Sequence, residues 1–350
     1  MSYLIIVIFI FTLIFALFEN YLKQYRGYVY ILIGLILILI AGLREVGIDP
    51  DSYDYESNFL HSENTESMNA VEYSYILISN FVHSFSNDVH ILFLIYAFLG
   101  VSLKMYAFRK FSDSWFITLA IYISYYYVLH DCIQIRTGVL SGLLLMAIIK
   151  LGDGKKKTAF LLLALGCFFH YSAIILLPVF FLSNKEMSKK QRIVWGAIIG
   201  FSYIFSTISS SFAFNYAENI PYIGTKVATY KNLTDRGNAM AYINIFGPLQ
   251  IITMLFYFYI LYFYDTIKVY NKYLPVMIKM FSLGLFFYVA FSFLPAFGER
   301  VSYLYEIVRI VLYANVYYTI RPKWAAALAL LCIGFFNMSL CLGYLGFKMF

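Results

Sequence analysis

Long apolar stretches separated by short polar ones run through the whole chain. Most stretches are long enough for a helix that crosses a membrane, and the polar segments between them hold most of the charged residues. The stretches expected to be helices are 3–18, 28–42, 88–104, 115–130, 132–149, 158–169, 171–182, 193–213, 241–264, 274–297, 301–320 and 324–346. The pattern predicts an all-α polytopic membrane protein, one transmembrane domain over residues 1–350, with about 12 crossings.

Two of these crossings are short and form a helical hairpin. Basic clusters at Lys155–Lys157 and Lys185–Arg192 flank one apolar stretch, and cytoplasmic loops collect Lys and Arg, so both clusters are expected inside. A single crossing would put one cluster on the wrong side. We therefore expect two arms, Thr158–Phe169 and Tyr171–Leu182, each about 18 Å long and short of a ~30 Å hydrocarbon core. His170 lies at the tip, beneath the outer face of the membrane.

Two long loops are expected on the outer side, at 43–72 and 214–240. Loops of this length are usually functional or disordered. The first leads into Tyr73–Phe85, which is too short and too polar to span a membrane but suits an amphipathic helix at the outer surface. Any chemistry is expected at this outer face.

Composition supports a membrane protein and gives no sign of nucleic-acid binding or of a cysteine site. The 350 residues are 62% hydrophobic and 13% charged, and the mean hydropathy is +0.74. The net charge of +7 fits basic cytoplasmic loops beside anionic lipid, and nothing indicates binding to nucleic acid. The four cysteines lack metal-ligand spacing, so neither a disulfide nor a cysteine metal site is predicted.

The first candidate site follows the second helix, in the segment GLREVGIDPDSYDY. Arg44 emerges from that helix, and Gly47, Asp49 and Tyr53 follow it. Gly, Asp and Pro favour a tight turn that folds back toward the bilayer. The alternative is a solvated loop with an anchoring arginine.

Arg136 and His170 are polar groups within apolar stretches. A guanidinium stays charged at physiological pH, so Arg136 needs an anionic partner or water at that depth. The alternative for Arg136 is snorkelling to the membrane surface. An intramembrane histidine is a functional candidate, and the alternative for His170 is a structural hydrogen bond between helices.

A further candidate lies in the segment PAFGERVSYLYEIVRI, where charged and aromatic residues repeat at helical spacing. Glu306 and Arg309 can neutralise each other, whereas Arg300, three residues before Tyr303, has no opposite charge at i+3 or i+4. Three arginines that reach one membrane face from separate helix ends indicate a phosphate or diphosphate site. One guanidinium group can donate two parallel hydrogen bonds to two phosphate oxygens.

Taken in order, these motifs resemble the Wzy-type polysaccharide polymerases, in particular the EpsG-like branch. The resemblance covers residues 28 to 320 and rests on the order and spacing of short motifs. They are Arg44-x-x-Gly47-x-Asp49 followed by Tyr53, Ile135-Arg136-x-Gly138, Phe169-His170-x-Ser172-Ala173, and Arg300-x-x-Tyr303.

The resemblance implies an inner-membrane glycosyltransferase with a GT-C-like fold that makes O-antigen, capsule or exopolysaccharide. Its donor and acceptor are undecaprenyl-diphosphate-linked oligosaccharides on the periplasmic or outer side, and a chain-length regulator is a further expected partner. By carry-over Arg44, Arg136 and Arg300 are the functional arginines, and His170 is the functional histidine. The guanidinium argument above assigns the three arginines to the diphosphate. Tyr53 and Tyr303 are assigned to the sugar.

The residues are compatible with a mechanism that uses neither a cofactor nor a metal. Arginines would stabilise the lipid diphosphate leaving group, although Asp49 and Asp51 could form an acidic metal cluster. The general base for the acceptor hydroxyl is His170, with Asp49 as the alternative. Other functions that fit the sequence are an O-antigen ligase and a flippase or transporter of lipid-linked oligosaccharides.

Overall fold

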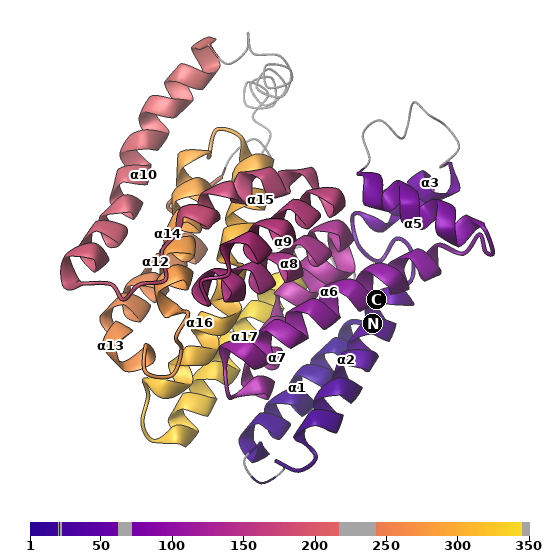
Figure 1. Cartoon of the computed structure of the whole chain (residues 1–350), viewed down its shortest axis with the longest axis horizontal. Coiled ribbons are helices and arrows are strands. Elements are labelled where there is room, and N and C mark those ends of the chain that lie inside the picture. Colours follow the sequence, from indigo (N-terminus) through magenta and orange to yellow (C-terminus); the bar gives the residue numbers. More distant parts are fainter. Residues whose placement is uncertain (20, 22, 62–71, 217–242, 345–350) are drawn as a thin grey trace. The chain divides into compact units, whose positions relative to one another are not determined.

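The computed structural model describes residues 1–19, 21, 23–61, 72–216 and 243–344 (Figure 1). Every regular element within these ranges is a helix, and the described residues contain no strand, so the predicted all-α class is confirmed. Contacts divide the chain into two compact units, which we describe one at a time. The first comprises Met1–Phe181, Tyr270–Tyr273 and Ile310–Phe350, and the second comprises Leu182–Val269 and Leu274–Arg309. A single transmembrane domain and a GT-C-like fold stay predictions.

The first unit holds most of the described helices, including α3, which no apolar stretch predicted. They are α1 (Ser2–Phe18), α2 (Arg26–Gly42), α3 (Ser52–Leu60), α5 (Tyr73–His83), α6 (Val89–Phe111), α7 (Trp115–Ser124), the π-helix η1 (Tyr127–Ile133), α8 (Ile135–Gly152), α9 (Lys156–Phe169), the 3₁₀-helix η2 (Tyr171–Phe181), α16 (Arg309–Asn315) after its first residue, η6 (Val316–Tyr318) and α17 (Lys323–Tyr344).

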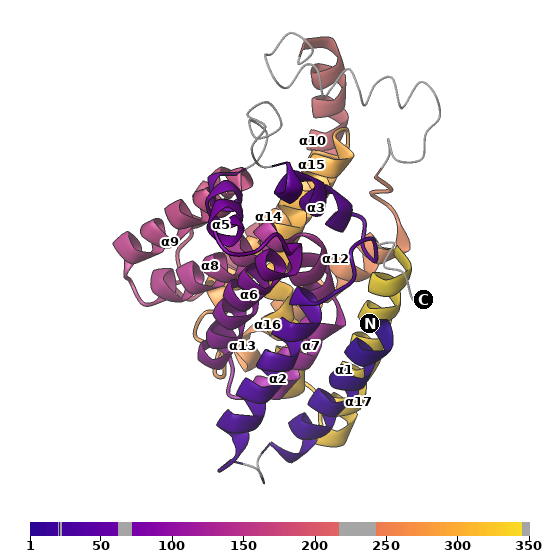
Figure 2. The ribbon, with the colours of Figure 1, turned by 90° about the vertical axis from the view of Figure 1, so that its right-hand side faces the viewer.

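Helix α6 lies in the middle of this unit. It packs against α2, α5 and α8, and α8 in turn packs against α9. Helix α1 packs against α7 and α17, and Figure 2 shows α1 and α17 side by side. The aromatic residues Phe93 and Tyr96 of α6 are buried in a cluster with Tyr75 of α5 and Phe169 of α9. This cluster holds α5 and the end of α9 against the start of α6.

Three described helices are long and apolar enough to cross a membrane: Val89–Phe111, Ile135–Gly152 and Lys323–Cys341. A fourth crossing results if Trp115–Ser124 and Tyr127–Ile133, which are bent by 65°, form one broken span. Five shorter apolar helices have 10–17 residues. These helices are those of a membrane protein, and the count of about 12 crossings stays a prediction.

The hairpin is present, with its break at His170. Helix α9 packs against η2, and the backbone of His170 between them is extended (φ −156°, ψ 124°). The second arm is a 3₁₀-helix, not the α-helix expected: it contains Pro178, and its buried residues Ala173, Leu176 and Val179 repeat every three positions. At 1.5 Å and 2.0 Å per residue, the arms reach about 21 Å and about 22 Å.

The expected outer loops are only partly described. The first contains helix α3, which was not predicted, and residues 62–71 lie outside the described part. Helix α5 confirms the helix predicted at Tyr73–Phe85. In the second loop, α10 extends to Tyr216, and 217–240 lie outside the described residues.

The second unit is built around one apolar helix. It contains α10 (Lys189–Tyr216), α12 (Pro248–Tyr262), α13 (Tyr264–Ile267), α14 (Leu274–Ala290), α15 (Pro295–Tyr305) and η5 (Glu306–Val308), and α14 packs against α10, α12 and α15. Arg309 Nη1 lies 2.8 Å from Glu306 Oε2, which confirms the predicted ion pair. A Cβ at Gly284 would lie 2.6 Å from the Glu306 side chain, so this glycine lets α14 approach the pair.

Candidate active site

The segment after α2 folds into a turn around one buried ion pair. Arg44 Nε donates to Asp49 Oδ2 at 3.0 Å, Arg44 Nη1 donates to the Ala41 carbonyl at 2.6 Å, and both charged side chains are fully buried. Asp49 Oδ1 accepts the Ser52 N–H at 2.9 Å. Gly47 has φ 88°, a conformation that side chains with a Cβ rarely adopt. The predicted turn is therefore present, and Arg44 and Asp49 are partners within it.

A second charged cluster joins three helix ends. Glu72 lies directly before α5, Arg136 is the second residue of α8, and His170 lies between α9 and η2. Arg136 Nη1 donates to Glu72 Oε2, and His170 Nδ1 is hydrogen-bonded to Glu72 Oε1. The Glu72 side chain is 5% exposed, whereas those of Arg136 and His170 are 25% and 19% exposed. The carboxylate is thus the buried centre, and its two partners reach the surface.

The backbone around Glu72 leaves its carboxylate free to bind Arg136 and His170 instead of capping α5. Glu72 is the N-cap residue of α5, and its carbonyl accepts the Tyr75 N–H at 2.9 Å. Its side chain makes no capping hydrogen bond, because both oxygens face Arg136 and His170. The positive end of the α5 dipole further favours a negative charge at this position.

Two aromatic rings separate the two charged clusters. The Arg44 guanidinium lies 4.0 Å from the centre of the Phe93 ring, and the Arg136 guanidinium lies 5.5 Å from that of Tyr55. Phe93 and Tyr55 contact each other edge to face, with centroids 6.3 Å apart. The structure therefore brings Arg44 and Arg136 into one region, and only Arg136 exposes its side chain there.

Glu72, Arg136 and His170, which we call the Glu72 cluster, have the components of a proton-transfer site beside an anion site. A carboxylate bonded to one imidazole nitrogen orients the ring and stabilises it when the ring takes up a proton. The guanidinium supplies a fixed positive charge for an anionic group. Sequence reasoning missed Glu72, which is 64 residues from Arg136 and 98 from His170. The only available signal was that an arginine within an apolar stretch needs an anionic partner.

The remaining predicted site residues lie in both units. Tyr53 of α3 is exposed, and its hydroxyl lies over Gly47, where a Cβ would approach it to 2.4 Å. Arg300 and Tyr303 both lie on α15 in the second unit; Arg300 is exposed and Tyr303 is partly buried. Convergence of Arg300 with the other two arginines stays a prediction.

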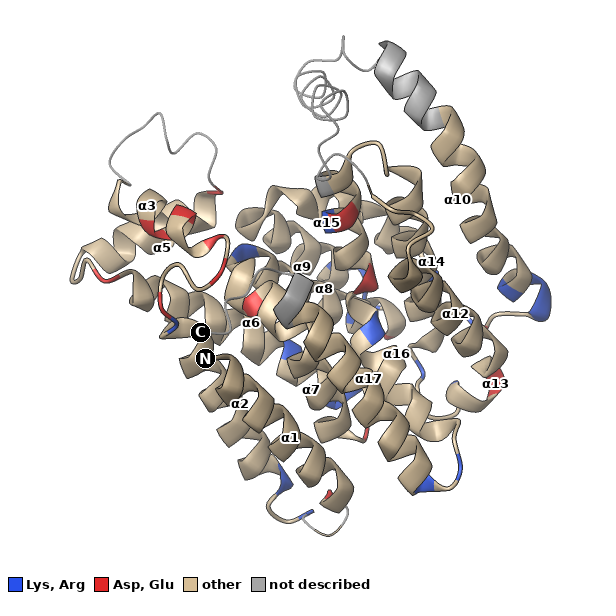
Figure 3. Cartoon of the chain, turned by 180° about the vertical axis from the view of Figure 1, so that it is seen from behind, with Lys and Arg blue, Asp and Glu red and all other residues tan. Residues whose placement is uncertain are grey.

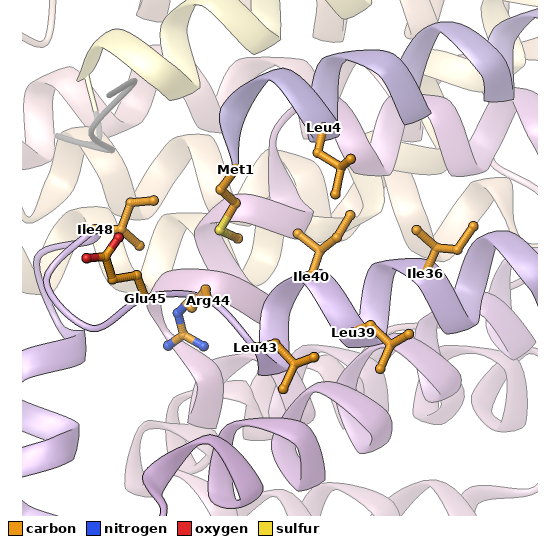
Figure 4. Close-up of a pocket in the computed structure, with 9 residues that line it drawn as sticks. All are labelled: Met1, Leu4, Ile36, Leu39, Ile40, Leu43, Arg44, Glu45 and Ile48. Carbon is orange, nitrogen blue, oxygen red and sulfur yellow. The ribbon is translucent and has the colours of Figure 1, made fainter.

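An apolar groove of about 520 Å³ lies between the start of α1 and the end of α2 (Figure 4). Its lining residues are Met1, Leu4, Ile36, Leu39, Ile40, Leu43, Arg44, Glu45 and Ile48. Most of these side chains offer hydrocarbon contact and no group that exchanges a proton. Among the described residues no group of three or more His, Cys, Asp or Glu could hold a metal ion. The Glu72 cluster is therefore the better candidate for chemistry.

Comparison with known proteins identifies the family. The model of the EpsG family matches residues 27–348, which is nearly the whole chain. The chain belongs to the EpsG family. The resemblance to the EpsG-like branch, which rested on four short motifs, is thereby confirmed.

One relative of this EpsG-family chain is the amylovoran biosynthesis protein AmsC of Erwinia amylovora. The two are 23% identical over 310 residues, which cover 83% of this chain and 80% of AmsC. No solved structure matches the chain. All four motifs lie within the region matched by the EpsG family, and so does Glu72.

Proposed function

We propose that this EpsG-family protein polymerises lipid-linked oligosaccharide repeat units at the outer face of the cytoplasmic membrane. The growing chain is transferred from undecaprenyl diphosphate to a hydroxyl of an incoming lipid-linked repeat unit. The observation that carries the proposal is the Glu72 cluster, which holds a histidine and a partly exposed arginine side by side. The biosynthetic role in the name of AmsC supports a function in polysaccharide synthesis.

The reaction assigns one task to each member of the cluster. His170 takes the proton of the acceptor hydroxyl at Nε2, while its Nδ1 is held by Glu72. The acceptor oxygen forms a bond to the anomeric carbon of the donor chain, and the bond from that carbon to the diphosphate oxygen breaks. The leaving diphosphate keeps the bonding electrons, and Arg136 stabilises its negative charge. The His170 proton then passes to the diphosphate or to water.

The other predicted residues take supporting roles. Arg44 and Asp49 form a fully buried ion pair, so we assign them to shaping the turn that carries Tyr53 to the surface. This arrangement favours His170 over Asp49 as the base, because both Asp49 oxygens already accept hydrogen bonds. Arg300 and Tyr303 are proposed to bind the second diphosphate and a sugar. No metal is invoked.

The distribution of charge in the first unit supports an outer-facing site. Figure 3 shows acidic residues on α3 and the loop before it, and basic residues where α2 begins. Arg26 is the first residue of α2, and Arg109 and Lys110 lie in the last turn of α6. Because α6 runs in the opposite direction to α2, these basic residues lie at the same end of the two helices. Because cytoplasmic segments collect Lys and Arg, this distribution supports the proposal that the Glu72 cluster faces the opposite, outer side.

Deletion of the gene, followed by gel analysis of surface polysaccharide, tests this function. Loss of the polymerase leaves a product with a single repeat unit. Loss of a flippase leaves no surface product, and loss of an O-antigen ligase leaves polymer on its lipid carrier. Either of the last two results would overturn the proposal.

A further inference from the structure

A third charged cluster lies inside the apolar part of the first unit. Lys104 of α6 and Asp131 of η1 form an ion pair with Nζ 2.9 Å from Oδ1, and their side chains are 0% and 1% exposed. The hydroxyl of Tyr122 on α7 donates to Asp131 Oδ2 at 2.6 Å. We call these three residues the Lys104 clamp. None of them belongs to the Glu72 cluster.

The clamp is attached directly to the first turn of α8. Lys104 Nζ donates to the carbonyl of Gly138 at 2.5 Å, and Gly138 lies two residues after Arg136. A Cβ at Gly138 would lie 2.5 Å from the His130 carbonyl, and one at Gly100 would lie 2.3 Å from Asp131 Oδ1. The two glycines therefore allow α6, η1 and α8 to meet around the ion pair.

The chain needs such an anchor at this point because the helix is broken there. Helix α7 and η1 meet at 65°, and Gln134, which separates η1 from α8, leaves the helical conformation (φ −94°, ψ 64°). Helix α8 restarts at Ile135 without a side-chain capping bond. With the regular helix interrupted, the direction of its first turn, and of Arg136 on it, depends on other contacts.

We propose that the Lys104 clamp positions Arg136 for the leaving diphosphate. Burying an ion pair rarely adds stability compared with apolar side chains of similar size, so its presence in an apolar environment calls for another role. Fixing the first turn of α8 keeps Arg136 against Glu72 and within reach of the substrate. The clamp touches no reacting atom, so its members are positioning residues. This inference rests on the function proposed above.

The test uses the purified full-length protein and purified lipid-linked repeat units. Either single substitution, Lys104→Met or Asp131→Leu, leaves a buried charge without its partner and is expected to lower the amount of folded protein. The double variant removes both charges and is expected to fold to normal levels. Misplacement of a catalytic group by about 1 Å can lower a rate by about 10²-fold, and we expect kcat of the double variant to fall by about that factor.

A double-mutant cycle with Arg136→Lys separates positioning from general stability. If the clamp acts through Arg136, removing it in the Arg136→Lys background lowers kcat by less than about threefold, because the effects of coupled residues do not multiply. Tyr122→Phe keeps the ion pair and the ring, and should show the same coupling with a smaller loss.

Two results would overturn the inference. One is a double variant with normal protein level and normal kcat, which would show that the clamp does not position Arg136 for the reaction. The other is a full 10²-fold further loss in the Arg136→Lys background, which would make the two sites independent. A wild-type protein that forms no polymer at all would instead overturn the proposed function, so the two failures are distinguishable.

Discussion

Replacing Glu72 by Gln tests the site with the smallest change in shape. The variant keeps the size of the side chain but removes the negative charge that His170 and Arg136 share. Two unit charges about 4 Å apart attract by about 4 kcal/mol at an effective dielectric constant of ~20, which sets an upper limit. A hydrogen bond to a charged group contributes about 1.5–3 kcal/mol, and each 1.4 kcal/mol is tenfold in rate. We therefore expect kcat to fall by about 10- to 200-fold.

The assay follows polymer formation from purified lipid-linked repeat units by reconstituted protein, as initial rates over a range of substrate concentrations. Glu72→Asp keeps the charge and shortens the side chain by one methylene, so its kcat should lie between those of the wild type and Glu72→Gln. The matched control is Glu56→Gln in α3, since Glu56 forms no ion pair with the residues that the structure describes. We expect normal rates from this control.

A Glu72→Gln protein that accumulates normally and keeps a wild-type kcat would refute the reasoning, because neither the orientation of His170 nor the charge near Arg136 would then matter. A fall in kcat that comes with loss of folded protein would point to stability instead. Comparing kcat per folded molecule, measured by size-exclusion chromatography, separates these outcomes.

Three further predictions concern the base, the arginines and the topology. His170→Gln keeps a hydrogen-bonding side chain of similar size but takes up no proton near neutral pH, so turnover in the same assay should fall by about 10²–10⁴-fold; a near-normal rate would redirect the search to another base. Arg136→Lys and Arg300→Lys keep their charge but lose paired hydrogen bonds, so both should lose most polymer on gels, and normal polymer would limit them to a topological role. Single cysteines replacing Lys156 and Lys189 should resist a membrane-impermeant thiol reagent added outside, and labelling at Lys189 alone would contradict the hairpin.

Much of the helical framework could be predicted because apolar length and basic flanks are local signals. The break at His170 follows from two basic clusters around one apolar stretch, and the structure has it at that residue. The 3₁₀ form of Tyr171–Phe181 was missed although Pro178 lies within it, since length alone cannot separate an α-helix from a 3₁₀-helix. Helix α3 was missed because its polar sequence lies among turn residues.

The candidate site could be predicted only in part. Arg136 and His170 were found because each is a costly polar group in an apolar stretch. Glu72 carries no such signal, because it lies at the end of a polar loop where acids are common. Its two partners come from α8 and from the hairpin tip, so their meeting depends on how α5, α8 and α9 pack. The periodicity of apolar residues along the chain does not predict how these helices pack.

The positions of these groups follow from where helices stop. Within a regular membrane helix, side chains point either to lipid or to neighbouring helices, and neither direction gives a charged group access to a polar substrate. Glu72, Arg136 and His170 each lie at a helix end or break, where the chain changes direction and can reach the aqueous side. Ends are also less well fixed than helix interiors. The buried pair Lys104–Asp131, next to the break that precedes Arg136, supplies that restraint from within the apolar core, and this explains why charge is present so deep in the unit.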